Sequence, residues 1–184
     1  MPTLRSSTTL AVGTALATTL LLSGCAAGSA TPGSANDTDL HFLAMMTPHH
    51  EQAVQMSDIV LAADGVSEET REIAERIRSG QQQEIVTMLG WVAEWRQEPL
   101  LRQHSEHIAN GMVTPERMSA LGALDGAAAE QTFLEEMVVH HEGAIAMTQD
   151  QIDNGGYAEL RALAQQMIDV QTAEIAEMNR LLGS

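Results

Sequence analysis

The chain of 184 residues is long enough for one domain of ordinary size and a processed leader. All nine basic residues are arginines, and they stand against 25 acidic residues, so the formal net charge is -16. This charge excludes the common nucleic-acid-binding classes, because such a surface repels phosphate, and it attracts cations instead. The single cysteine, Cys25, cannot form an intramolecular disulfide.

The N-terminal segment has the pattern of an export signal. Arg5 gives a short positive region, and residues 8–22 form an apolar run that is too short to span a bilayer stably. The run ends in Leu-Ser-Gly-Cys at Cys25, which resembles a bacterial lipoprotein signal. We therefore predict a signal peptide over residues 1–24, acylation of Cys25, and a flexible tether over residues 25–38.

Either of two processing routes exports the protein. Acylation of Cys25 anchors the domain to the outer face of a bacterial membrane, and the lipid is then its only membrane contact. Cleavage of an ordinary secretory signal after a small residue is the alternative, and the protein is then secreted.

The first helix is expected to begin at a cap on Asp37 or Thr38 and to end near Gly65. Pro48 falls inside this segment. Because the apolar pattern continues upstream of Pro48, we expect a kinked helix rather than one that begins there.

The second helix is expected to begin at Ser67, with acidic residues in its first turn, and to end before Pro99. Gln81 and Glu84 occupy positions of its buried stripe where the helical spacing calls for apolar residues. These two polar side chains are the first sign of chemistry inside the fold.

The connection over residues 98–126 is rich in glycine and proline and is expected to hold one short helix that begins at Thr114. His104 and His107 lie in it without a strong apolar stripe, so we interpret them as exposed. The third and fourth helices are expected over about residues 128–153 and 157–182.

The two halves of the chain repeat each other at a distance of about ninety residues. The segment from Phe42 to Met56 and the segment from Phe133 to Met147 share Phe, Leu, Met, a His-His pair, Glu, Ala and Met in register. The Gln81 helix is repeated in the same way by Gln171 and Glu174 of the fourth helix. Two such hairpins predict an all-α, ferritin-like four-helix bundle over residues 39–184, with hairpins at 39–97 and 127–184.

Packing the two hairpins together brings the histidine pairs toward each other, with the two glutamates on the flanking helices. A buried carboxylate needs a cationic or donor partner, yet the chain has no lysine and no arginine on these stripes. A metal ion is the partner we favour. The predicted ligands are His49, His50, His140, His141, Glu84, Glu174, Met46 and Met137, and the predicted surrounding groups are Gln81, Gln171, Met56, Met147, Glu51 and Glu142.

The identity of the ion follows from the donors. Imidazole and thioether ligands in an exported, acidic chain with no cysteine available to the folded domain favour copper, while zinc and iron remain alternatives. A closed hydrogen-bond network of His, Gln and Glu side chains, with no metal, is the structural alternative.

The sequence is also compatible with two other functions. A ferritin-like dimetal oxidase expects Glu-x-x-His on two helices, but Met46, Thr47, Met137 and Val138 stand three residues before the histidines. A lipid-tethered scaffold would instead use the acidic surface to bind another exported protein or a second copy of the chain.

The doubled pattern Phe-Leu-x-x-Met-x-x-His-His-x-x-Ala-x-x-Met, with Gln-x-x-Glu-Ile-x-x-Met in the following helix, closely resembles the family catalogued as domain of unknown function 305 (DUF305). The resemblance covers residues 39–184. It implies a ferritin-like four-helix bundle, usually exported, with some members linked to copper binding and resistance, and it implies no enzyme activity. Copper sequestration, delivery or tolerance is the function it favours.

Overall fold

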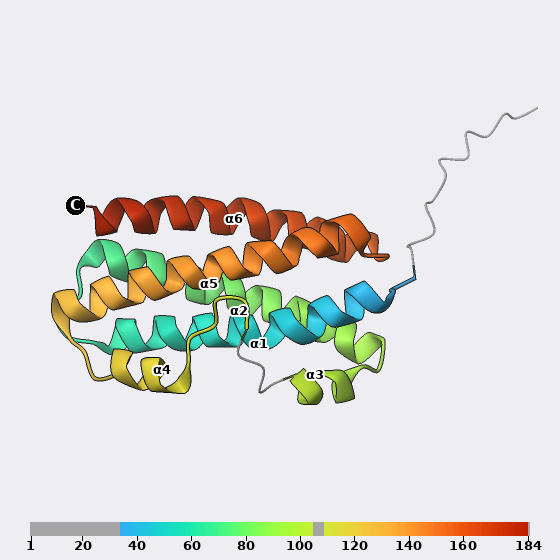
Figure 1. Ribbon diagram of the computed structural model, residues 1–184, viewed down its shortest axis with the longest axis horizontal. Helices are drawn as coiled ribbons and strands as arrows, with labels where there is room; N and C mark the ends of the chain where they lie inside the picture. Colours follow the sequence, from blue (N-terminus) through green and yellow to red (C-terminus); the bar gives the residue numbers. More distant parts are fainter. Residues whose placement is uncertain (1–33, 105–108, 184) are drawn as a thin grey trace, which may run out of the picture. The chain divides into compact units, whose positions relative to one another are not determined.

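The computed structural model describes residues 34–104 and 109–183, so the leader, Cys25 and His107 lie outside the described residues. Six helices follow one another along the chain (Figure 1): α1 Asp37–Ala62, α2 Glu68–Glu94, α3 Glu98–His104, α4 Pro115–Leu121, α5 Gly126–Asn154 and α6 Ala158–Leu182. No described residue belongs to a β-strand, and the all-α prediction is confirmed. In the same part of the chain, no helix combines the length and apolar character needed to cross a membrane.

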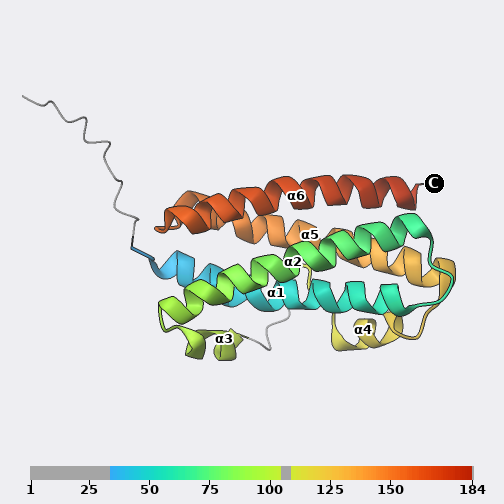
Figure 2. The same ribbon diagram turned by 180° about the vertical axis from the view of Figure 1, so that it is seen from behind.

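The four long helices form a bundle, as predicted. The helix α1 packs against α2 and α5, and α6 packs against α5 and α2 (Figures 1 and 2). Hydrogen bonds at both ends show that α1 and α5 are antiparallel. The Asn36 side chain donates to the Asn154 carbonyl at 2.9 Å, and the Gly126 amide donates to the Asp64 carbonyl at 2.6 Å.

The helix ends follow local sequence signals, with two corrections. The cap of α1 is Asn36 rather than Asp37 or Thr38, because Asn36 and Asp39 form a reciprocal capping box. The short helix α3 was not predicted. Pro48 lies inside α1, which continues through it, as expected.

A polar layer divides the apolar core into two clusters. Each long helix contributes to it: His49 and His50 from α1, Gln81 and Glu84 from α2, His140 and His141 from α5, and Gln171 and Glu174 from α6. On α1, Phe42 and Met46 belong to one apolar cluster and Ala53 and Met56 to the other, so the histidines lie between them. On the other three helices, too, the polar residues lie between the two apolar clusters. The polar layer is therefore at the centre of the bundle.

Candidate metal centre

The four predicted histidines are buried together in the polar layer. His49 is 1% exposed and His50, His140 and His141 are 0% exposed. Their burial follows from the helical spacing of the apolar residues, which turns both members of each pair toward the bundle interior. All four histidine side chains therefore lie inside the bundle, on the faces that the periodicity predicts to be buried.

One histidine of each pair is held by a glutamate. His50 Nε2 lies 2.7 Å from Glu84 Oε2, and His141 Nε2 lies 2.8 Å from Glu174 Oε2. Because an ionised carboxylate can only accept a hydrogen bond, Nε2 carries the proton in both rings. In the neutral form of each ring, Nδ1 then holds a lone pair. This atom is buried without a hydrogen-bond partner in both rings.

The other two histidines meet at the centre. The rings of His49 and His140 lie with their centroids 3.7 Å apart and their planes tilted by 37°. His49 Nε2 donates to the backbone carbonyl of Asn110 at 2.9 Å, which leaves His49 Nδ1 buried without a partner. Neither ring nitrogen of His140 has a partner, so this ring contributes two further unsatisfied atoms.

Burial keeps the central rings neutral. The pKa of His49 is lowered from 6.5 to about 3, and desolvation by burial is the largest cause. The hydrogen bond to the Asn110 carbonyl raises the pKa, and the nearby His50 and His141 lower it further. Desolvation also holds the pKa of His140 well below its ordinary value, with His49 as the next cause. Neutral imidazole is the form that binds a metal ion, so both rings are in the state that ligation requires.

A narrow crevice leads from solvent to the glutamates. It lies between α2 and α6, has a volume of about 20 Å³, and is lined by Gln81 and Glu84 from one helix and Gln171 and Glu174 from the other. The carboxylate side chains are 16% and 12% exposed. The side-chain oxygens of Gln81 and Gln171 are buried without partners. The network of His, Gln and Glu is therefore not closed by hydrogen bonds.

A backbone segment that is not among the predicted site residues lies against the central histidines. Residues 110–113 cross α5 so closely that a Cβ on Gly143 would lie 1.6 Å from the Asn110 carbonyl oxygen. Gln52 fastens the same segment to α1, because it donates to the Val113 carbonyl at 2.9 Å and accepts from the Val113 amide at 2.7 Å. The sequence repeat could have indicated this segment. Gln52 and Gly143 occupy equivalent positions in the two copies but are different residues, and both contact the segment.

The remaining predicted residues lie in the apolar clusters, in a separate cavity or on the surface. Met46 and Met137 are fully buried, one in each apolar cluster next to the layer. Met56 packs in the core, Met147 lines a separate cavity, and Glu51 and Glu142 are exposed.

The donor set fits a soft cation better than a hard one. Among the described residues, no three His, Cys, Asp or Glu side chains form a group that could hold a metal ion. Glu84 and Glu174 are each bound to a histidine, so no pair of them bridges two irons in this arrangement. The layer offers instead five imidazole nitrogens without hydrogen-bond partners, and Met46 and Met137 lie in the apolar clusters on either side of it. Imidazole nitrogen and thioether sulfur are donors that Cu(I) accepts.

Comparisons with known proteins agree with this fold. The sequence model of the family described as "Domain of unknown function (DUF305)" matches residues 39–182. A search of curated proteins finds no match. A presumed secreted DUF305 protein from Streptomyces coelicolor is 32% identical and superposes with a TM-score of 0.71, covering 79% of this chain and 92% of that one.

Two further solved structures are similar to this chain. A DUF305 fragment from Deinococcus radiodurans is 28% identical, with a TM-score of 0.72 over 81% of this chain and 97% of that one. CopM in its Cu(II)-bound form is 28% identical, with a TM-score of 0.69 over 79% of this chain and 95% of that one. CopM has also been solved in Cu(I)-bound and Ag-bound forms. The family match spans most of the chain, and the chain therefore belongs to the DUF305 family.

Proposed function

We propose that this protein binds a soft transition-metal ion, copper in its physiological setting, through the two histidine pairs of the polar layer. The single observation that carries the proposal is the set of five imidazole nitrogens that are buried without a hydrogen-bond partner, on His49, His50, His140 and His141. A buried polar atom without a partner costs about 1–3 kcal/mol, and native proteins seldom leave several together without a use.

The glutamates prepare the ligands. Because Glu84 and Glu174 accept the Nε2 proton of His50 and His141, they fix the tautomer and the ring orientation and direct the Nδ1 lone pair into the layer. Asn110 does the same for His49 through its backbone carbonyl. A carboxylate–imidazole pair also raises the basicity of the ligating nitrogen.

The methionines next to the layer supply the second kind of donor. Met46 precedes His50 by one helical turn and Met137 precedes His141 by one turn, so each thioether follows the same helix face as its histidine. Thioether sulfur selects soft ions such as Cu(I) and Ag(I) over Zn(II). The copper-bound and silver-bound structures of CopM support this choice of ion.

The location we propose follows from the leader sequence. Residues 1–24 act as a lipoprotein signal, Cys25 carries the lipid, and residues 25–38 tether the bundle to the outer face of a membrane. An ion-binding bundle in that position serves copper sequestration, delivery or tolerance.

The test is a thermal-unfolding titration of the full chain with Ag(I), with Cu(I) under a reductant, and with Zn(II). Native-state binding raises the melting temperature, by the equivalent of about 2.7 kcal/mol at a hundredfold excess over Kd. We expect Ag(I) and Cu(I) to give a larger rise than Zn(II).

The matched variants separate metal binding from packing. His49→Leu/His140→Leu removes three buried, unpartnered nitrogens, so its metal-free form is expected to be at least as stable as the wild type, but its rise in melting temperature with Ag(I) is smaller than that of the wild type. Met88→Leu, a volume-conserving change in the apolar core, keeps the full response. A full Ag(I) response in the histidine variant overturns the proposal.

A further inference from the structure

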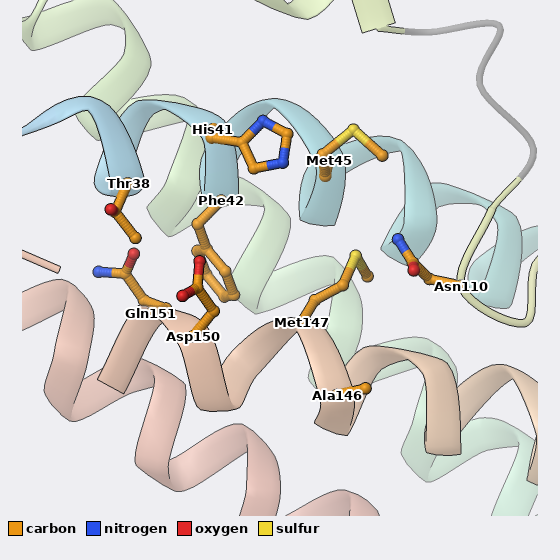
Figure 3. Close-up of a pocket in the computed structure, with 9 residues that line it drawn as sticks. All are labelled: Thr38, His41, Phe42, Met45, Asn110, Ala146, Met147, Asp150 and Gln151. Atoms are coloured by element: carbon orange, nitrogen blue, oxygen red, sulfur yellow. The ribbon is translucent and has the colours of Figure 1, made fainter. Parts of the chain in front are cut away.

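A second cavity with metal-binding side chains lies outside the polar layer. It is formed by the first half of α1 and the second half of α5 and has a volume of about 270 Å³. His41 and Met45 of α1 line it together with Met147 and Asp150 of α5 (Figure 3). Asn110, whose carbonyl accepts a hydrogen bond from His49, forms part of its wall, and none of the four central histidines lines the cavity.

The donor atoms in the cavity come from two helix faces. His41 and Met45 are one turn apart on α1, and Met147 and Asp150 are about one turn apart on α5, so each pair shares a face. Figure 3 shows the imidazole of His41 beside the side chain of Met45, and the sulfur of Met147 pointing from α5 toward α1. One imidazole, two thioethers and one carboxylate therefore line the same space.

The exposure of the two methionines sets them apart. The other methionines of the four long helices are at most 1% exposed, which is what apolar packing requires: Met46, Met56, Met88, Met137, Met167 and Met178. Met45 and Met147 are half-buried, and their side chains line a cavity that solvent reaches. A thioether in that position is accessible to an ion.

The repeat relates the residues of this cavity to equivalent residues near α4. In the second copy, Glu136 takes the place of Met45, and in the first copy Met56 takes the place of Met147. At that equivalent position, α4 packs against α1 and α5: Arg117 forms an ion pair with Glu136, and Leu121 joins the core cluster that contains Met56. Side chains of α4 therefore pack at one of the two equivalent positions, whereas at the other position an imidazole and two thioethers line a cavity.

We propose that this cavity is a second, solvent-accessible site for a soft monovalent cation, Cu(I) or Ag(I), bound by the imidazole of His41 and the thioethers of Met45 and Met147. Asp150 offsets the charge of the ion. The cavity has room for several waters at roughly 30 Å³ each, and the flexible methionine side chains can close on an ion that takes their place. The site is separate from the histidine pairs, and its test does not depend on them.

The test follows methionine methyl groups during titration of the full chain with Ag(I). Protein labelled with ¹³C at the methionine methyls reports each thioether separately by NMR. We expect the signals of Met45 and Met147 to shift on Ag(I) addition.

The stoichiometry of Ag(I) binding gives a second readout. We expect the triple variant His41→Gln/Met45→Leu/Met147→Leu to bind one equivalent less than the wild type. Met118→Leu, which changes a half-buried methionine outside the cavity, keeps the wild-type stoichiometry. Unmoved Met45 and Met147 signals, or full stoichiometry in the triple variant, overturn the proposal.

The histidine variant separates the two sites. If His49→Leu/His140→Leu still shifts Met45 and Met147, the cavity binds on its own, as proposed. If that variant loses the Met45 and Met147 shifts, the cavity proposal fails while the central site stands. If the triple variant loses all Ag(I) binding, the cavity site stands and the central site fails.

Discussion

The four histidines of the polar layer have three different hydrogen-bond states, although the sequence contains the same pair twice. His50 and His141 are symmetric, each with a glutamate on Nε2. His49 and His140 are not, because Asn110 reaches only His49. We therefore expect substitutions at these four residues to have unequal effects on stability and on the proposed metal binding.

The depressed pKa values predict a stability loss in acid. An unfolded histidine takes up a proton below about pH 6.5, whereas folded His49, with its pKa lowered to about 3, does not. The unfolded state thus binds more protons in this window, and the unfolding free energy falls as the pH drops from 6.5 toward 3, by about 1.4 kcal/mol per pH unit for each such histidine. His140 adds to the slope in the same direction.

Urea unfolding of chelator-treated protein between pH 7.5 and pH 4 measures this slope. The expected curve is level with respect to these groups above pH 6.5 and falls below it. In His49→Leu/His140→Leu the fall is shallower. Parallel curves for the two proteins would show that the central rings are not neutral in the folded state.

At the scale of elements, the breaks in the repeat are where the connection between the hairpins crosses the bundle. Gly143 leaves room for Asn110, and Gly111, at a φ of 81°, would place a Cβ 2.3 Å from the Val139 carbonyl oxygen. Gln52 holds Val113 on the other side. The crossing segment therefore accounts for the identities of three residues. Gln52 and Gly143 differ from each other in the repeat, and Gly111 has a positive φ.

Gly143→Ala tests the role of this crossing. The new methyl group cannot coexist with the Asn110 carbonyl, so the segment must move away from α5 and the bond to His49 breaks. We expect a loss of about 1–3 kcal/mol in unfolding free energy. Gly80→Ala is the matched control: its Cβ would meet nothing within 4 Å, and alanine stabilises an exposed helix interior by about 0.5–1 kcal/mol. Equal, stabilising effects of both changes, measured by urea unfolding, would contradict a close crossing.

At the scale of the molecule, one buried carboxylate joins the two hairpins. Asp39 is 0% exposed and accepts bonds from the Gly156 amide at 2.9 Å, the Tyr157 amide at 3.1 Å and the Gln151 side chain at 2.6 Å. It also accepts from the Asn36 amide at 2.7 Å. The start of α1 is thereby fixed to the turn between α5 and α6.

Removing this joint should destabilise the whole bundle. Asp39→Ala leaves several buried donors without an acceptor, and we expect a loss of about 3 kcal/mol or more, seen as a lower midpoint of thermal unfolding. Asp37→Ala, in the same first turn but exposed, is expected to cost at most about 1 kcal/mol. Similar midpoints for the two variants would mean that Asp39 does not link the hairpins.

The sequence predicted the bundle and the buried histidines because periodicity alone decides which face of a helix is buried. His49, His50, His140 and His141 stand on apolar stripes, and the glutamates follow at the same register of the partner helices. The sequence could not predict α3, the hydrogen bond between His49 and the Asn110 carbonyl, or the cavity that His41 lines. These depend on where an aperiodic connection crosses the bundle, and no local pattern encodes that path.

In the proposed site, the Nδ1 atoms of the histidine pairs are the ligands of a soft cation. ¹⁵N NMR of histidine-labelled full-length protein during titration with Ag(I) observes these atoms individually. We expect the Nδ1 signals of His50 and His141 to shift on Ag(I) binding while their Nε2 atoms stay protonated toward Glu84 and Glu174. Imidazole signals that do not respond to Ag(I), or a shift confined to Nε2 with loss of its proton, would contradict it.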